Sequence, residues 1–170
     1  MRLNYYLNLP NLISLTRFFL SPFILFAPEG FIAVFFFLLA FSDALDGFLA
    51  RRLKMQTQLG KVLDPLADKV MILCGLYVCT LRLELLPKSL LYLTLLRDAF
   101  ILLGSALLIM KRKLIPSARC FGKAFTLFLS LLIVLCMLGV SIQVLLWLVF
   151  FLLLASWIDY ALLGLKTLRS

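Results

Sequence analysis

Apolar runs of about the length of a membrane-spanning helix follow one another along most of this chain. Crossing a bilayer takes roughly 20 apolar residues in a helix. Six runs approach that length, at about 11–27, 31–50, 60–80, 89–110, 121–139 and 142–165. With 170 residues, an apolar fraction of 64% and a mean hydropathy of +1.11, the chain is too apolar and too short to bury these runs in a soluble core. We therefore predict an all-α integral membrane protein with six transmembrane helices, forming a single domain over residues 1–170.

Basic residues gather on one side of this predicted topology. Six spans place both termini on the same side, together with the links at 51–61 and 111–123. That side carries twelve basic residues: Arg2, Arg51, Arg52, Lys54, Lys61, Lys111, Arg112, Lys113, Arg119, Lys123, Lys166 and Arg169. The opposite side carries only Arg82 and Lys88. By the positive-inside rule we expect a multi-pass protein of the inner (cytoplasmic) cell membrane with both termini in the cytoplasm. The net charge of +9 then reflects topology and attraction to anionic lipid, and we expect no nucleic-acid partner.

Four of the eight acidic residues lie within one short stretch of mostly apolar sequence. They are Asp43, Asp46, Asp64 and Asp68. Residues three or four apart share one face of a helix, so each pair forms a stripe, and the short link between the second and third helices makes these helices antiparallel neighbours. Asp43 and Asp68 each lie about 12 Å below the cytoplasmic boundary, from the helical rise per residue. We predict that the four carboxylates meet between these two helices, in a site open to the cytoplasm.

The charges in this stretch indicate a metal site. Four neighbouring carboxylates would not all stay ionised, and Arg51 and Lys69 supply only two opposing charges. One or two hard divalent ions with oxygen ligands resolve the imbalance, and Mg²⁺ or Mn²⁺ is the natural choice. Gly47 and Gly60 leave room for a bulky group, so the stretch suits a metal-bound diphosphate. The alternative is a buried ion-pair network or the cation pathway of a transporter. Histidine is absent, so acid–base chemistry falls to carboxylates, lysine or tyrosine.

The spacing of the stretch resembles the signature of a known family. It reads Asp43-x2-Asp46-Gly47-x2-Ala50-Arg51-x8-Gly60-x3-Asp64-x3-Asp68. This pattern is similar at all eight fixed positions to that of the CDP-alcohol phosphotransferases, and the similarity extends over nearly the whole chain. The resemblance implies transfer of a phosphatidyl group from CDP-diacylglycerol to an alcohol, with release of CMP. It also implies a homodimer.

The resemblance also implies roles for particular residues. The four aspartates would bind two divalent ions, and Asp68 would also act as general base for the acceptor hydroxyl. The CDP site would be lined by Gly47, Arg51 and Gly60. Asn11 has two open interpretations, as a nucleotide contact or as the cap of the first helix.

The acceptor alcohol is indicated by further segments. The sequence at 64–69, the opening at 10–17 and the Arg97-Asp98 pair most resemble the family members that make phosphatidylglycerol phosphate. The acceptor would then be glycerol 3-phosphate, with Arg97, Arg119 and Lys123 as candidate ligands of its phosphate. Arg97 could equally pair with an intramembrane acid.

Two alternatives to this acceptor stay open. Phe125 stands where these members usually carry a second lysine, a departure that bears on the acceptor and not on the transferase chemistry. The same chemistry with phosphatidylglycerol as acceptor would give cardiolipin. In a different class, a cation or metal transporter would also carry acids along its pathway.

Overall fold

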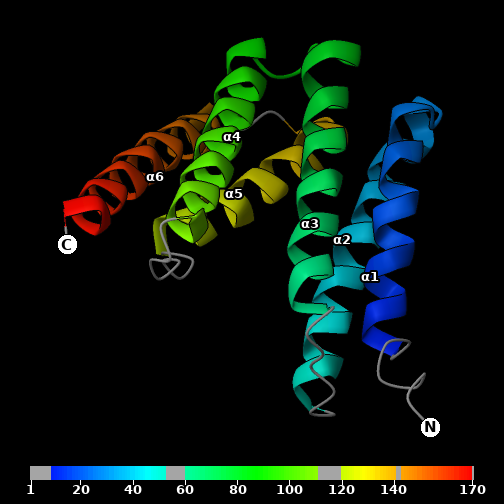
Figure 1. Cartoon of the computed structure of the whole chain (residues 1–170). Helices are drawn as coiled ribbons and strands as arrows, with labels where there is room; N and C mark the ends of the chain where they lie inside the picture. The colour runs from blue at the N-terminus through cyan, green and yellow to red at the C-terminus, as the bar shows by residue number, and fades with distance from the viewer. Residues whose placement is uncertain (1–8, 53–59, 111–119, 141–142, 170) are drawn as a thin grey trace, which may run out of the picture. The chain divides into compact units, whose positions relative to one another are not determined.

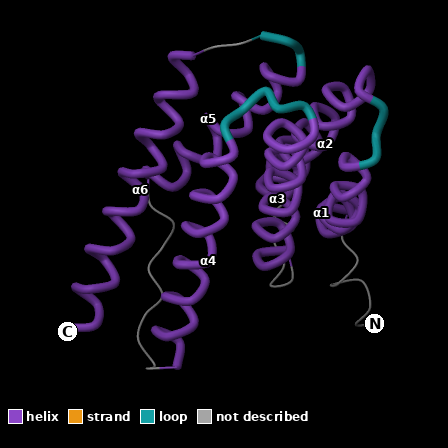
Figure 2. The backbone as a smooth tube through the Cα atoms, turned by 90° about the horizontal axis from the view of Figure 1, so that it is seen from above, coloured by secondary structure: helices purple, strands orange, loops and turns teal. Residues whose placement is uncertain are grey.

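The structure is a computed structural model that describes residues 9–52, 60–110, 120–140 and 143–169, with side chains at 11–42, 63–104, 120–140 and 143–164. These residues are almost entirely helical and include no strand (Figures 1 and 2). The helices are α1 (Leu9–Leu20), the 3₁₀ helix η2 (Ser21–Leu25), α2 (Glu29–Arg52), α3 (Gly60–Tyr77), the π-helical turn η3 (Val78–Arg82), α4 (Lys88–Met110), α5 (Cys120–Met137) and α6 (Gln143–Arg169). The prediction of an all-α protein is confirmed, and each apolar run of the sequence corresponds to one of the six α-helices.

The helices end at residues that favour a break. Pro28 precedes α2, and its carbonyl accepts a hydrogen bond from the backbone N–H of Phe31 (2.9 Å). Pro87 precedes α4 and accepts in the same way from Leu90 (3.0 Å). Proline lacks an N–H, so it suits the start of a helix and not its interior. Gly139 follows α5 with φ of 77°, the left-handed conformation in which glycine ends a helix without strain.

The helices form two units. The first contains α1, η2, α2, α3 and η3, in which α1 packs against α2 and α3, and these two pack against each other. Helices α2 and α3 run in opposite directions, so the end of α2 and the start of α3 lie at the same end of the unit (Figure 1). Apolar side chains fill the interior: Ile24, Ile32, Phe36, Met71 and Leu76 are all 2% exposed or less.

The second unit consists of α4, α5 and α6. Its interior includes Phe125, Leu129 and Ile133 of α5 and Val149 and Leu153 of α6, each nearly or fully buried. The charged side chain of Arg97 is buried within this unit.

Large apolar side chains are exposed in both units. Phe19, Phe31, Trp147 and Phe151 are each more than 60% exposed. A water-soluble protein carries such residues singly, whereas lipid covers many of them without penalty. Among the described residues, α5 and the part of α6 from Gln143 to Gly164 are long and apolar enough to cross a membrane. This surface suits a membrane-bound protein.

Candidate active site

Two of the four predicted acidic ligands lie one helical turn apart on α3. Asp64 and Asp68 are both half-buried, and Ala67 and Met71, close to them on the helix, are buried at 0% and 2% exposed. The Asp64 carboxylate accepts a hydrogen bond from the Ser14 hydroxyl of α1, with 2.6 Å between Oγ and Oδ1. Asp64 therefore lies on the side of α3 that meets α1.

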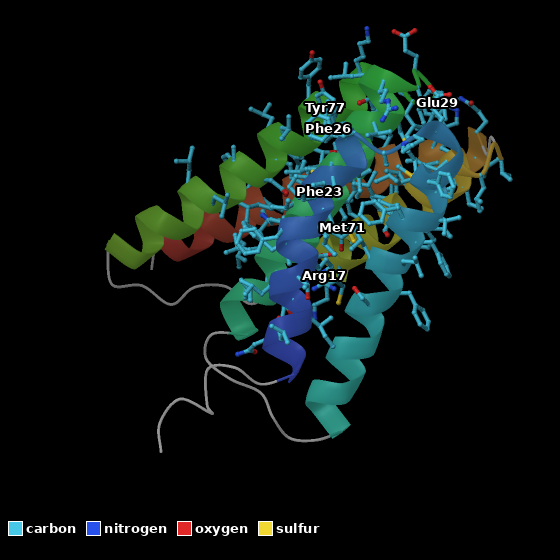
Figure 3. All side chains as sticks on the ribbon, turned by 90° about the vertical axis from the view of Figure 1, so that its right-hand side faces the viewer. Arg17, Phe23, Phe26, Glu29, Met71 and Tyr77 are labelled. Atoms are coloured by element: carbon cyan, nitrogen blue, oxygen red, sulfur yellow. The ribbon has the colours of Figure 1, made fainter. Side chains whose placement is uncertain are left out.

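The buried side of helix α1 is polar, whereas its exposed side is mostly apolar. Its buried polar residues are Asn11, Ser14 and Arg17, followed in η2 by Ser21; all are 4% exposed or less. Their spacing of three, three and four residues places them on one helix face. Arg17 lies nearer the end of the unit where α1 begins, and Phe26 and Glu29 lie at the opposite end (Figure 3). This face, Asn11–Ser14–Arg17–Ser21, is called the polar stripe of α1 below.

The other predicted ligands lie on α2. Asp43, Asp46, Gly47 and Arg51 belong to this helix, but their side chains fall outside the described residues. Gly60 is the first residue of α3. Because α2 and α3 are antiparallel neighbours, the backbone is compatible with facing acidic pairs. The meeting of all four carboxylates stays a prediction.

The carboxylate oxygens that the described residues offer fit a divalent cation as ligands. Asp64 and Asp68 offer hard carboxylate oxygens from one face of α3, and such oxygens are the ligands that Mg²⁺ and Mn²⁺ prefer. Among the described side chains, no group of three or more aspartate, glutamate or cysteine residues could complete a site. Asp43 and Asp46, which lie outside that set, are the candidates for the remaining ligands.

A second polar cluster surrounds Arg97 in the other unit. Its guanidinium donates from Nε (3.1 Å) and Nη2 (2.9 Å) to Ser156 Oγ of α6, and from Nη1 to Asp98 Oδ1 (2.9 Å). The guanidinium carbon lies 4.8 Å from the centre of the Phe125 ring and 5.8 Å from that of Tyr160, within the range of cation–π attraction. Ser156 is fully buried and Arg97 is 5% exposed. These partners fix the guanidinium at the first turns of α5.

Gly122 allows this close approach. A Cβ atom at this position would lie 3.1 Å from Arg97 Nη2 and 3.1 Å from the Tyr160 hydroxyl. Lys123, the next residue, is exposed on α5. Arg119 lies outside the described residues. Of the two interpretations of Arg97, pairing with an acid is observed with Asp98, and the role as phosphate ligand stays a prediction.

Phe125 takes a definite place in this cluster. The sequence marked it as a departure from the lysine usual at this position. In the structure it is buried (1% exposed), with its ring against the Arg97 guanidinium. A lysine there would bring a second positive charge beside a buried guanidinium. The phenylalanine instead supplies a ring face that attracts the cation.

Four residues of these clusters were not assigned a function from the sequence. The sequence could have indicated Ser14 and Arg17, because polar residues at helical spacing interrupt an apolar run at 11, 14, 17 and 21. No sequence pattern indicates Ser156 and Tyr160, because their partner Arg97 is about 60 residues away along the chain.

Comparisons with known proteins agree with the pattern of the acids. The family model described as CDP-alcohol phosphatidyltransferase matches residues 7–157. A CDP-diacylglycerol–glycerol-3-phosphate 3-phosphatidyltransferase of Aquifex aeolicus (strain VF5) is 40% identical over 174 residues, which cover 94% of this chain and 97% of the relative. A human cardiolipin synthase (CMP-forming) is 39% identical over 123 residues, covering 69% of this chain and 40% of the relative. A chloroplastic CDP-diacylglycerol–glycerol-3-phosphate 3-phosphatidyltransferase 1 of Oryza sativa subsp. japonica is 40% identical over 105 residues, covering 59% of this chain and 31% of the relative.

Proposed function

The chain belongs to the CDP-alcohol phosphatidyltransferase family, and from this membership we propose that it transfers the phosphatidyl group of CDP-diacylglycerol to glycerol 3-phosphate. The products are phosphatidylglycerol phosphate and CMP, so the enzyme acts in phospholipid biosynthesis. The observation that carries this proposal is the similarity to the Aquifex relative, which is named for this reaction and matches over 97% of its length. The human cardiolipin synthase matches over only 40% of its own length.

All six α-helices are proposed to cross the inner membrane, with both termini in the cytoplasm and the site between α2 and α3 open to it. The positions of the helices, the exposed apolar side chains and the twelve basic residues on one side support this topology. The family resemblance adds a homodimer, which a mass measurement in detergent would detect.

Asp43, Asp46, Asp64 and Asp68 are proposed to hold two divalent ions, Mg²⁺ or Mn²⁺. Bound there, the ions would offset the charge of the diphosphate and stabilise the departing CMP. Asp68 accepts the proton of the acceptor hydroxyl, a role that must fall to a carboxylate, lysine or tyrosine in a chain without histidine. Half-burial of Asp64 and Asp68 on one face of α3 supports these roles. Asn11, Gly47, Arg51 and Gly60 are proposed to bind the nucleotide.

The phosphate of the acceptor is assigned to Arg97, Arg119 and Lys123. A guanidinium carries five N–H groups, and within the described residues Arg97 donates three hydrogen bonds, to Ser156 and Asp98. Its two further N–H groups suit the oxygens of a phosphate. The close approach of the Arg97 guanidinium to the helix at Gly122, next to exposed Lys123, supports a shared anion site at the start of α5.

The proposal is tested with purified protein, CDP-diacylglycerol, Mg²⁺ or Mn²⁺ and a panel of acceptor alcohols. The expected result is CMP release that depends on glycerol 3-phosphate. Release that depends on phosphatidylglycerol instead would assign a cardiolipin synthase. Absence of CMP with every alcohol, together with metal flux into vesicles, would replace the enzyme by a transporter.

A further inference from the structure

We propose that Ser14 is a positioning residue for Asp64, and that its hydroxyl holds this carboxylate in the orientation that binds a divalent cation. This inference rests on the proposed metal role of Asp64. It starts from the hydrogen bond of 2.6 Å between Ser14 Oγ on α1 and Asp64 Oδ1 on α3. Ser14 is fully buried, so its hydroxyl lies away from solvent.

The direction of this hydroxyl separates Ser14 from the other hydroxyl residues nearby. Serine and threonine in a helix commonly donate to a backbone carbonyl one turn earlier. Ser21 does so, to the carbonyl of Arg17 at 2.7 Å, and Thr16 donates to the carbonyls of Leu12 and Ile13. Ser14 differs in donating to an acid 50 residues away on another helix. Its hydroxyl therefore joins α1 to the acidic face of α3.

The geometry indicates what the hydrogen bond does for Asp64. The distance of 2.6 Å between the two oxygens is that of a short hydroxyl–carboxylate hydrogen bond. A carboxylate has about four lone-pair positions on its two oxygens, so one bond from Ser14 leaves positions that can bind a cation. Fixing Oδ1 also fixes the plane of the carboxylate. Metal-ligating carboxylates are commonly held by such outer partners, and removing one typically costs about 10- to 100-fold in metal affinity.

The experiment measures Mn²⁺ binding to the purified full-length protein without substrate, by electron paramagnetic resonance of free Mn²⁺. Ser14→Ala is expected to weaken binding about tenfold, at the lower end of the range for lost outer partners. Ser14→Thr, which keeps the hydroxyl, is expected to bind as the unchanged protein does. Ser21→Ala is the matched control, because it removes a buried hydroxyl of the same polar stripe that bonds only the carbonyl of Arg17 among the described residues. It is expected to leave Mn²⁺ affinity unchanged.

Two results would overturn the role of Ser14. One is Mn²⁺ affinity in Ser14→Ala equal to that of the unchanged protein. The other is an equal loss in Ser21→Ala, which would make the effect one of packing. If Ser14→Ala does not yield folded protein, Ser14→Cys serves, since it keeps a similar volume with a weak donor and is expected to bind Mn²⁺ more weakly than Ser14→Thr.

Asp64→Asn separates this inference from the proposed function. If Asp64→Asn loses Mn²⁺ while Ser14→Ala keeps it, only the positioning role fails. If Asp64→Asn binds Mn²⁺ as the unchanged protein does, the proposed metal site fails and the role of Ser14 fails with it. Turnover adds a second readout. Ser14→Ala is expected to need a higher Mg²⁺ concentration for half-maximal CMP release, with kcat at saturating Mg²⁺ nearly restored.

Discussion

Asp68 and Asp64 share one face of α3, but they have different roles in the proposed reaction. Both would bind metal, and only Asp68 would also accept the proton of the acceptor hydroxyl. Ser14 donates a hydrogen bond to one oxygen of Asp64 and so holds that carboxylate in one orientation. At the scale of single residues, the assignment of base and ligand can therefore be tested by changing one carboxylate at a time.

Asp68→Asn is expected to insert and fold normally but to lose turnover. The loss should be roughly 10²- to 10⁴-fold, the range for removal of a general acid or base. The rate of CMP release at saturating substrates is the measurement. Asp159→Asn on α6 is the control, because we assign Asp159 no part in the chemistry. Near-normal activity of Asp68→Asn would exclude it as the base.

Gly122→Ala tests whether the position of Arg97 matters for the acceptor. The added methyl group would lie 3.1 Å from Arg97 Nη2 and 3.1 Å from the Tyr160 hydroxyl, so these side chains must give by a few tenths of an ångström. The KM for glycerol 3-phosphate is expected to rise several-fold, with that for CDP-diacylglycerol unchanged. Crowding is also expected to cost about 1–3 kcal/mol of stability.

Gly104→Ala is the matched control for this substitution. Gly104 lies on α4, and a Cβ atom there meets nothing within 4 Å among the described residues. Unchanged acceptor KM is expected. A rise in the CDP-diacylglycerol KM alone in Gly122→Ala would remove Arg97 from the acceptor site.

At the scale of helices, the sequence predicts the elements well and their partners poorly. The six helices follow from apolar runs separated by polar or proline-containing links, which are local features. The acidic stripe of α3 follows from a spacing of four residues. The bonds from Ser14 to Asp64 and from Arg97 to Ser156 join residues 50 and 59 positions apart, so they depend on how helices pack. Local spacing carries no information about such partners.

Arg82 provides a test of helix packing in the first unit. Its Nη1 donates to the carbonyls of Leu25 (3.1 Å) and Ala27 (2.8 Å), at the turn between η2 and α2. Arg82→Ala removes both bonds. Hydrogen bonds of charged groups contribute about 1.5–3 kcal/mol, and water competes for this exposed donor, so the free energy of unfolding is expected to fall by about 1–2 kcal/mol. A lower Tm in detergent with unchanged kcat at low temperature is the expected measurement. An unchanged Tm would show that these bonds contribute nothing to stability.

At the scale of the whole molecule, the distribution of charge predicts the orientation in the membrane. Twelve basic residues lie on the proposed cytoplasmic side and two on the other. A reporter that is active only outside the cytoplasm is expected to stay inactive when fused to the C-terminus. It should become active when fused in the link between η3 and α4. The reverse pattern would show that the topology is inverted and that the acidic site does not face the cytoplasmic substrates.

The transfer of a phosphatidyl group to glycerol 3-phosphate is tested most directly by following the acceptor itself. Labelled glycerol 3-phosphate is incubated with the purified protein, CDP-diacylglycerol and Mg²⁺ or Mn²⁺, and label in the lipid fraction is compared with released CMP. The expected result is one labelled lipid for each CMP, abolished by a chelator and restored by either ion. CMP released while the label stays in the aqueous phase would contradict glycerol 3-phosphate as the acceptor.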